Sequence, residues 1–82
     1  DYPRLLDNLR KSFNEGDSDM FMRSAHSLKG MLNNFRAETA AEVASDLEQK
    51  GKRADLTGGQ AGIESLAAQI AEVDKTLRNM IK

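Results

Sequence analysis

The sequence contains no cysteine, one proline and one histidine in 82 residues. Without thiols the chain can form neither a disulfide framework nor a thiolate metal site, and a lone histidine excludes a multi-histidine zinc site. The net charge is −1, from 12 Lys and Arg against 13 Asp and Glu, so no positive field attracts nucleic acid. No apolar run approaches the roughly 18 residues of a membrane span. We therefore expect no nucleic-acid partner and no membrane contact by this segment.

Good helix formers are abundant in the remaining composition, and the length suits one domain over residues 1–82. Apolar residues recur at steps of three and four, which is the period of an amphipathic helix. This pattern predicts four helices, over residues 3–15, 18–35, 37–50 and 61–81. Short connections favour antiparallel neighbours, so the predicted fold is all-α, an antiparallel up-down-up-down four-helix bundle.

Each predicted helix has one apolar face that should form the core of the bundle. The expected core residues are Leu5, Leu6, Leu9 and Phe13, then Phe21, Ala25, Leu28, Leu32 and Phe35, then Ala37, Ala40, Val43, Ala44 and Leu47, and finally Ile63, Leu66, Ile70, Val73, Leu77 and Met80. Gly16 and Gly51 are expected to end the first and third helices, and Asp17 to cap the second. The third helix is expected to begin at Ala37, although a capping box over residues 39–42 allows a later start.

His26 is the candidate reactive residue, and the helical period places it on the solvated flank of the second helix. Neutral imidazole is a nucleophile, and at a pKa of about 6.5 roughly three quarters of it is neutral at pH 7. Lys29 and Gly30 follow one turn later, where an ammonium could lie against a group carried by the ring and a bare backbone would give it room. The carboxylates are interpreted as solvated ion-pair partners, so no base is expected beside the ring.

Residues 25–30, Ala-His-Ser-Leu-Lys-Gly, resemble the signature of histidine-containing phosphotransfer (HPt) domains. The resemblance extends to Ala37 at the start of the next helix and to the pair at residues 47–48. It implies that His26 is the phosphoacceptor, with Lys29 and Gly30 as the phosphate neighbours. The sequence departs from the family pattern at Arg36, where the family usually has glycine.

The resemblance also implies a relay between receiver domains of response regulators. His26 would accept a phosphoryl group from a receiver phosphoaspartate and pass it to the aspartate of another receiver. The receiver would supply Mg²⁺, and the chain itself is expected to bind no metal or cofactor. The side chains expected to contact the receiver are Met22, Arg23, Asn33 and Arg36. Because the sequence begins without methionine, we expect it to be a piece of a longer protein, and the resemblance suggests the HPt module of a bacterial hybrid sensor histidine kinase. We expect this module to be monomeric and cytoplasmic, with the parent kinase anchored in a membrane.

Two other hypotheses remain open at this stage. The bundle could dock a receiver or another protein without any chemistry, or His26 could act as a pH switch. An enzyme that works alone is the least favoured hypothesis, because no second catalytic group is expected within reach of His26 along its helix.

Overall fold

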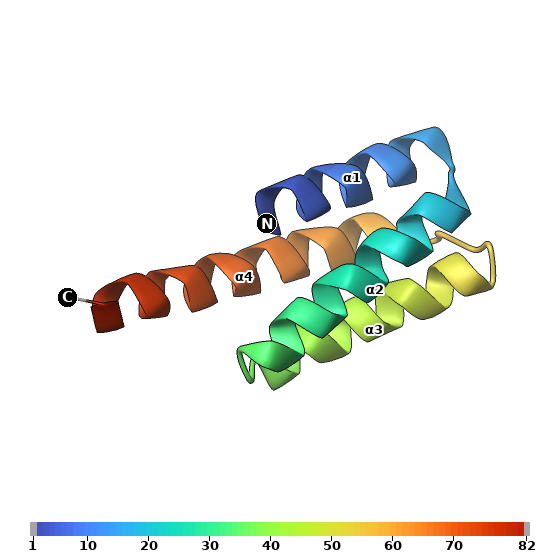
Figure 1. Ribbon diagram of the computed structural model, residues 1–82. Coiled ribbons are helices and arrows are strands. Elements are labelled where there is room, and N and C mark those ends of the chain that lie inside the picture. The colour runs from blue at the N-terminus through green and yellow to red at the C-terminus, as the bar shows by residue number, and fades with distance from the viewer. Residues whose placement is uncertain (1, 82) are drawn as a thin grey trace.

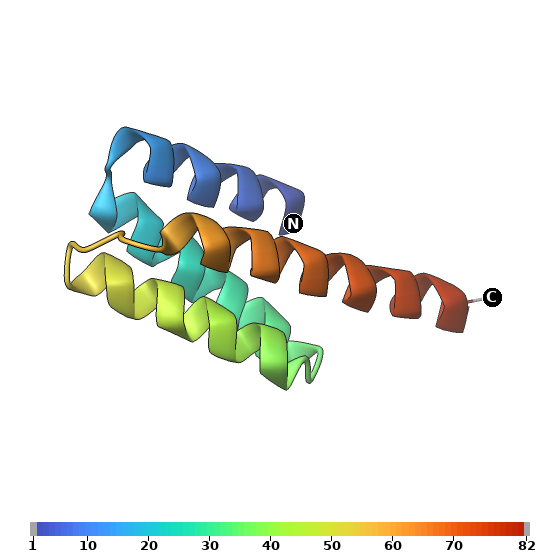
Figure 2. The same cartoon turned by 180° about the vertical axis from the view of Figure 1, so that it is seen from behind.

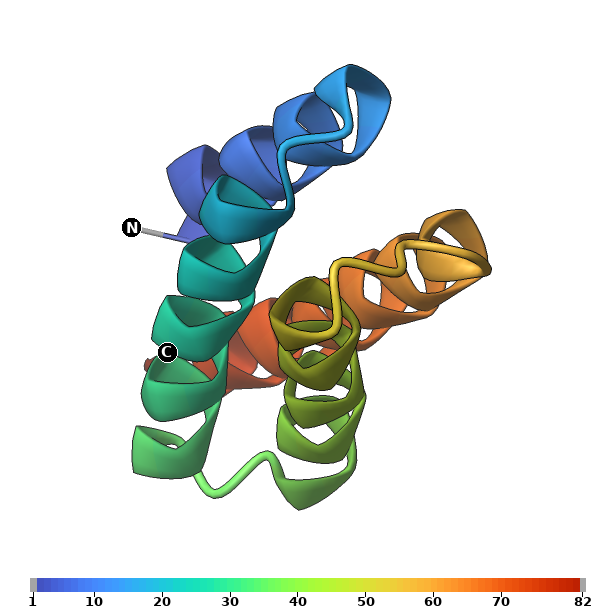
Figure 3. The same cartoon turned by 90° about the vertical axis from the view of Figure 1, so that its right-hand side faces the viewer.

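A computed structural model describes the backbone of residues 2–81 and the side chains of residues 3–75. Within residues 2–81 there are four helices and no strand: α1 (Tyr2–Glu15), α2 (Ser18–Asn34), α3 (Glu38–Lys52) and α4 (Gly59–Ile81). Consecutive helices run antiparallel (Figure 1), so the predicted up-down-up-down bundle is confirmed. From behind, α4 lies between α1 and α3 and extends past both at its C-terminal end (Figure 2). Viewed from the side, α2 and α3 stand next to each other (Figure 3), and this is the most extensive helix pair.

The predicted apolar faces meet in one core. The buried apolar residues are Leu6, Leu9, Phe21, Ala25, Leu28, Leu32, Ala40, Ala41, Ala44, Leu47, Ile63, Leu66 and Ile70. Ala41 joins them without having been predicted. Five residues predicted to be in the core are only half-buried: Leu5, Phe13, Ala37, Val43 and Val73. The predicted core residues Leu77 and Met80 lie outside the side chains that the structure describes.

The prediction that Phe35 belongs to the core is wrong, because α2 ends one residue before it and leaves Phe35 51% exposed. The chain reverses through a Schellman turn, in which the N–H of Ala37 donates to the carbonyl of Leu32 at 2.9 Å. Arg36 occupies the left-handed position of this turn, with φ 57°. That conformation favours glycine, so Arg36 carries a side chain at a position where glycine would be unstrained.

The turn between α1 and α2 follows the sequence prediction. Gly16 takes a left-handed conformation, with φ 70°, immediately after α1 ends. The Asp17 carboxylate accepts a hydrogen bond from the backbone N–H of Met20 at 3.1 Å, so it caps α2 as expected. The predicted start of α4 at residue 61 is two residues late, because α4 begins at Gly59.

Both ends of α3 differ from the prediction. Ala37 is the N-cap rather than the first helical residue, and no side chain caps the helix, so the capping box over residues 39–42 does not form. Gly51 does not end the helix, which continues to Lys52. Gly51 is instead buried against Met22 of α2, where an added Cβ would lie 2.8 Å from the backbone nitrogen and Cα of Met22. Its role at this position is therefore steric.

Candidate functional site

His26 lies in the middle of α2, on the face that points away from the core. Ala25 and Leu28 are fully buried and hold the opposite face of the helix against the rest of the bundle. The side chain of His26 is 66% exposed. The sequence correctly predicted an exposed imidazole, and the regular helix on both sides of His26 fixes the backbone that carries the ring.

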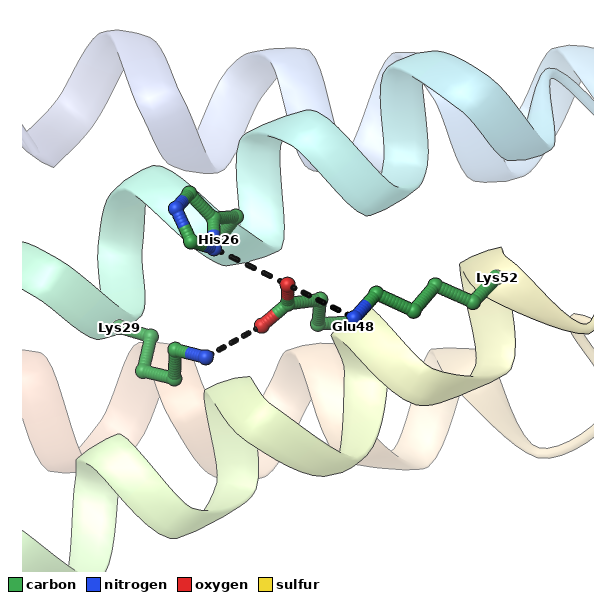
Figure 4. Close-up of polar contacts among 4 residues, drawn as sticks. All are labelled: His26, Lys29, Glu48 and Lys52. Carbon is green, nitrogen blue, oxygen red and sulfur yellow. Dashed lines mark hydrogen bonds and ion pairs between the residues drawn. The ribbon is translucent and has the colours of Figure 1, made fainter.

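Glu48 of α3 is the partner of His26 that sequence reasoning missed. Its side chain is only 5% exposed, and its Oε2 lies 3.0 Å from Nδ1 of His26 (Figure 4). The expectation of a ring without a base in reach is therefore wrong, because α3 packs against α2 and brings this carboxylate beside the ring. The sequence did hold a signal: at about 100° per residue, Glu48 lies about 40° from Ala44, within the apolar arc of its helix.

Two lysines surround the same carboxylate. Lys29 Nζ forms an ion pair with Oε1 of Glu48 at 2.7 Å, and Lys52 Nζ lies 3.7 Å from Oε2. The covering side chains are themselves partly or largely exposed, so Glu48 sits just beneath the surface rather than deep in the core. The Lys29 ammonium, assisted by His26, holds the pKa of the Glu48 carboxyl below its ordinary value against the opposing effect of burial. The carboxylate is therefore ionised at neutral pH.

The ionised carboxylate determines the tautomer of a neutral His26. A carboxylate accepts hydrogen bonds and donates none, so Nδ1 must carry the proton and donate a hydrogen bond to Glu48. The lone pair is then on Nε2, which points away from Glu48 (Figure 4). The site can thus present an oriented, uncharged nucleophile to a group that arrives from solvent.

The surface beside the ring is open. A groove of about 410 Å³ adjoins it, lined by Met22, Arg23, His26, Ser27, Glu48 and Lys52. Gly30, one turn further along α2, is exposed, and a Cβ built there would meet nothing within 4 Å. No internal packing therefore requires glycine at position 30, and an approaching group has room there.

The residues expected to contact a receiver do not all gather at this groove. Met22 and Arg23 line it, and Arg23 forms an exposed ion pair with Asp19. Asn33 borders a separate hollow between α2 and α3 that it shares with Lys29. Arg36 lies in the turn after α2, beside a hollow of about 460 Å³ between the start of α3 and α4, and His26 does not line that hollow.

The chain belongs to the Hpt domain family, because residues 1–80 match the model of the Hpt domain. Neither the curated proteins nor the solved structures include a significant match to the chain. Family membership assigns it to histidine phosphotransfer in the phosphorelays of two-component systems, in which Hpt domains interact with response-regulator receivers. Among the described residues, no helix is both long and apolar enough to cross a membrane.

Proposed function

We propose that His26 accepts a phosphoryl group on Nε2 from the phosphoaspartate of one receiver domain and passes it to the aspartate of another. The observation that carries this proposal is the bond between Nδ1 of His26 and Glu48, since it leaves the Nε2 lone pair directed to solvent. An exposed nucleophile in the middle of a helix can be reached by the active site of a second protein.

In the first transfer, the Nε2 lone pair of His26 forms a bond to phosphorus. The bond between phosphorus and the aspartyl oxygen breaks, and its electron pair stays on the receiver's carboxylate. The ring becomes cationic as it attacks, because Nδ1 keeps its proton. The Glu48 carboxylate stabilises this developing charge through the hydrogen bond that is already formed. Attack on the same phosphorus by the aspartate of a second receiver reverses these steps.

The cations near the ring suit the charge of a phosphoryl group. Lys29 and Lys52 approach Glu48 within 2.7 and 3.7 Å, and their flexible stems allow each ammonium to move toward a phosphoryl group on Nε2. Gly30 leaves space on the same face. We propose that the receiver supplies the Mg²⁺, as the resemblance to the family implies.

For docking we propose the groove beside the ring, with Met22 as an adaptable apolar contact and Arg23 as a charge for an acidic receiver rim. Asn33 and Arg36 would extend this contact along α2 only if the receiver covers the whole exposed face of the helix. Their separate position makes them secondary to Met22 and Arg23.

The test is label transfer from receivers of the same genome, phosphorylated in the presence of Mg²⁺. The wild-type chain should acquire a label that is labile in acid and stable in base, as expected for phosphohistidine. His26→Gln should acquire none, while Lys11→Gln, a change at an exposed residue of α1 that does not line the groove, should be labelled like the wild type and controls for the general effect of a surface substitution. Equal labelling of His26→Gln and wild type would overturn the proposal. Receiver binding that persists in His26→Ala, with no label on wild type, would support docking without chemistry instead.

A further inference from the structure

α2 and α3 approach each other very closely where Gly51 of α3 lies against Met22 of α2. A Cβ at position 51 would lie 2.8 Å from N, Cα and Cβ of Met22. Two of these atoms belong to the backbone, so a side chain at position 51 could not be accommodated by a change of rotamer. Ordinary contacts between carbon atoms are about 3.5–4.0 Å, so a side chain here would push the two helices apart by roughly 1 Å.

This contact lies one turn from the site on both helices. Gly51 follows Glu48 by three residues, and Met22 precedes His26 by four, so in each helix the two positions share a face. Because α2 and α3 are antiparallel, the Gly51–Met22 contact and the His26–Glu48 hydrogen bond lie next to each other along one interface. The distance between the helices at Gly51 therefore influences their distance at Glu48.

The hydrogen bond has little tolerance for a change in spacing. Nδ1 of His26 and Oε2 of Glu48 are 3.0 Å apart, and such bonds are largely lost beyond about 3.5 Å. Extending Glu48 toward the ring would lengthen the ion pair of its other oxygen with Lys29, which is now 2.7 Å. A separation of the helices by roughly 1 Å, from the contact distances above, would take Nδ1 beyond the reach of Oε2.

We propose that Gly51 is a positioning residue whose missing side chain sets the α2–α3 spacing at which Glu48 holds the proton on Nδ1 of His26. Gly51 has no conformational need to be glycine, because it lies inside α3 and is not among the residues with positive φ. Glycine inside a helix costs roughly 0.5–1 kcal/mol relative to alanine, and the close approach to Met22 explains why it stands there. The consequence for phosphotransfer rests on the proposed function, but the geometry can be tested without it.

The experiment reads the tautomer of His26 from the ¹⁵N shifts of its ring, recorded at an alkaline pH above which the shifts no longer change. His26 is the single histidine, so the ring signals are unambiguous. In the wild type we expect a protonated Nδ1 and an unprotonated Nε2, with widely separated shifts. Glu48→Ala should move both shifts toward those of free imidazole, and Gly51→Ala should produce at least half of that movement. Wild-type shifts in a folded Gly51→Ala would overturn the proposal.

Two further variants make the result decisive. Ile70→Ala, in α4, lowers stability without touching the α2–α3 contact, so it should keep wild-type ring shifts. If Gly51→Ala does not fold, Met22→Ile presses on the same contact from α2 through its second branch on Cβ. Unchanged ring shifts in Met22→Ile would then count against the proposal, and shifted ones would support it. Since no phosphoryl transfer is measured, a wild type that takes no label would refute the proposed function and leave this test intact.

Discussion

The interface that α4 makes with the bundle and the interface between α2 and α3 stabilise the same fold by different means. α4 contributes large aliphatic side chains, with Ile63, Leu66 and Ile70 all at most 3% exposed. Where α3 meets α2 near His26, its residues are a carboxylate, Glu48, and a residue without a side chain, Gly51. Burial of large side chains supplies most hydrophobic stabilisation, whereas small ones allow close approach. α4 thus supplies large aliphatic side chains to the core, whereas the α2–α3 pair, the most extensive in the bundle, also brings a carboxylate to His26.

The largest effect is expected from shortening a buried side chain in the α4 interface. Leu66 is fully buried, and Leu→Ala changes in cores cost about 2–5 kcal/mol. We expect Leu66→Ala to lower the free energy of unfolding by that amount, as measured by urea denaturation. The folded fraction should keep the ring shifts of wild-type His26. A changed tautomer in folded Leu66→Ala would show that the two interfaces are not separate.

The complementary change removes the carboxylate at the other interface. A hydrogen bond to a charged group contributes about 1.5–3 kcal/mol, so Glu48→Ala should slow phosphoryl uptake by about one to two orders of magnitude. Glu48→Gln keeps a carbonyl oxygen that can accept from Nδ1 of His26, and it should slow uptake less. Single-turnover labelling by a phosphorylated receiver measures both rates. Uptake at the wild-type rate in Glu48→Ala would remove Glu48 from the mechanism.

Acid should weaken the α2–α3 interface before the α4 interface, because the former depends on an ionised group. The ion pair with Lys29 lowers the pKa of Glu48 below its ordinary value of 4.5. Its stabilising contribution is therefore complete above that value and is lost as the pH falls through the lower pKa of the folded state. Urea denaturation at several pH values should show a steeper acid loss for the wild type than for Glu48→Gln. Parallel curves would contradict this, since other carboxylates such as Asp55 titrate in both proteins.

The smallest expected effect lies in the turn that joins α2 to α3. Arg36 adopts φ 57°, which costs a residue with a side chain roughly 1–2 kcal/mol, partly offset by the greater chain entropy that glycine loses on folding. Arg36→Gly should therefore raise the free energy of unfolding by up to about 1 kcal/mol. Arg53→Gly is the matched control, because Arg53 is right-handed at φ −84° and should gain nothing. Equal effects at the two positions would refute the conformational explanation.

The four helices could be predicted from the sequence because their apolar residues repeat at the helical period over many turns. Phe35 continued that repeat and was assigned to the core for the same reason. Its exposure depends on a left-handed residue at Arg36, and without a glycine there nothing in the local sequence indicates where the helix ends. Periodicity therefore predicts the body of a helix better than its last turn.

The site was predicted only in part, since exposure of His26 follows from one helix whereas its partner comes from another. Glu48 lay within the apolar arc of its own helix, but its charge suggested a solvated position. Gly51 was interpreted as a helix stop because glycine commonly follows the last residue of a helix. Only the placement of α2 against α3 distinguishes these roles, and that placement involves Met22, which is 29 positions away in the sequence.

About two thirds of the His26 side chain faces water, with an exposed fraction of 66%. A phosphorylated ring on this chain would accordingly have no enclosure of its own. Exclusion of water strengthens the electrostatic interactions on which transfer depends, and here the visiting protein must provide it. Under the proposed function, the reaction site is closed to water only while a receiver is bound, and the shape of the receiver determines which complexes transfer the phosphoryl group.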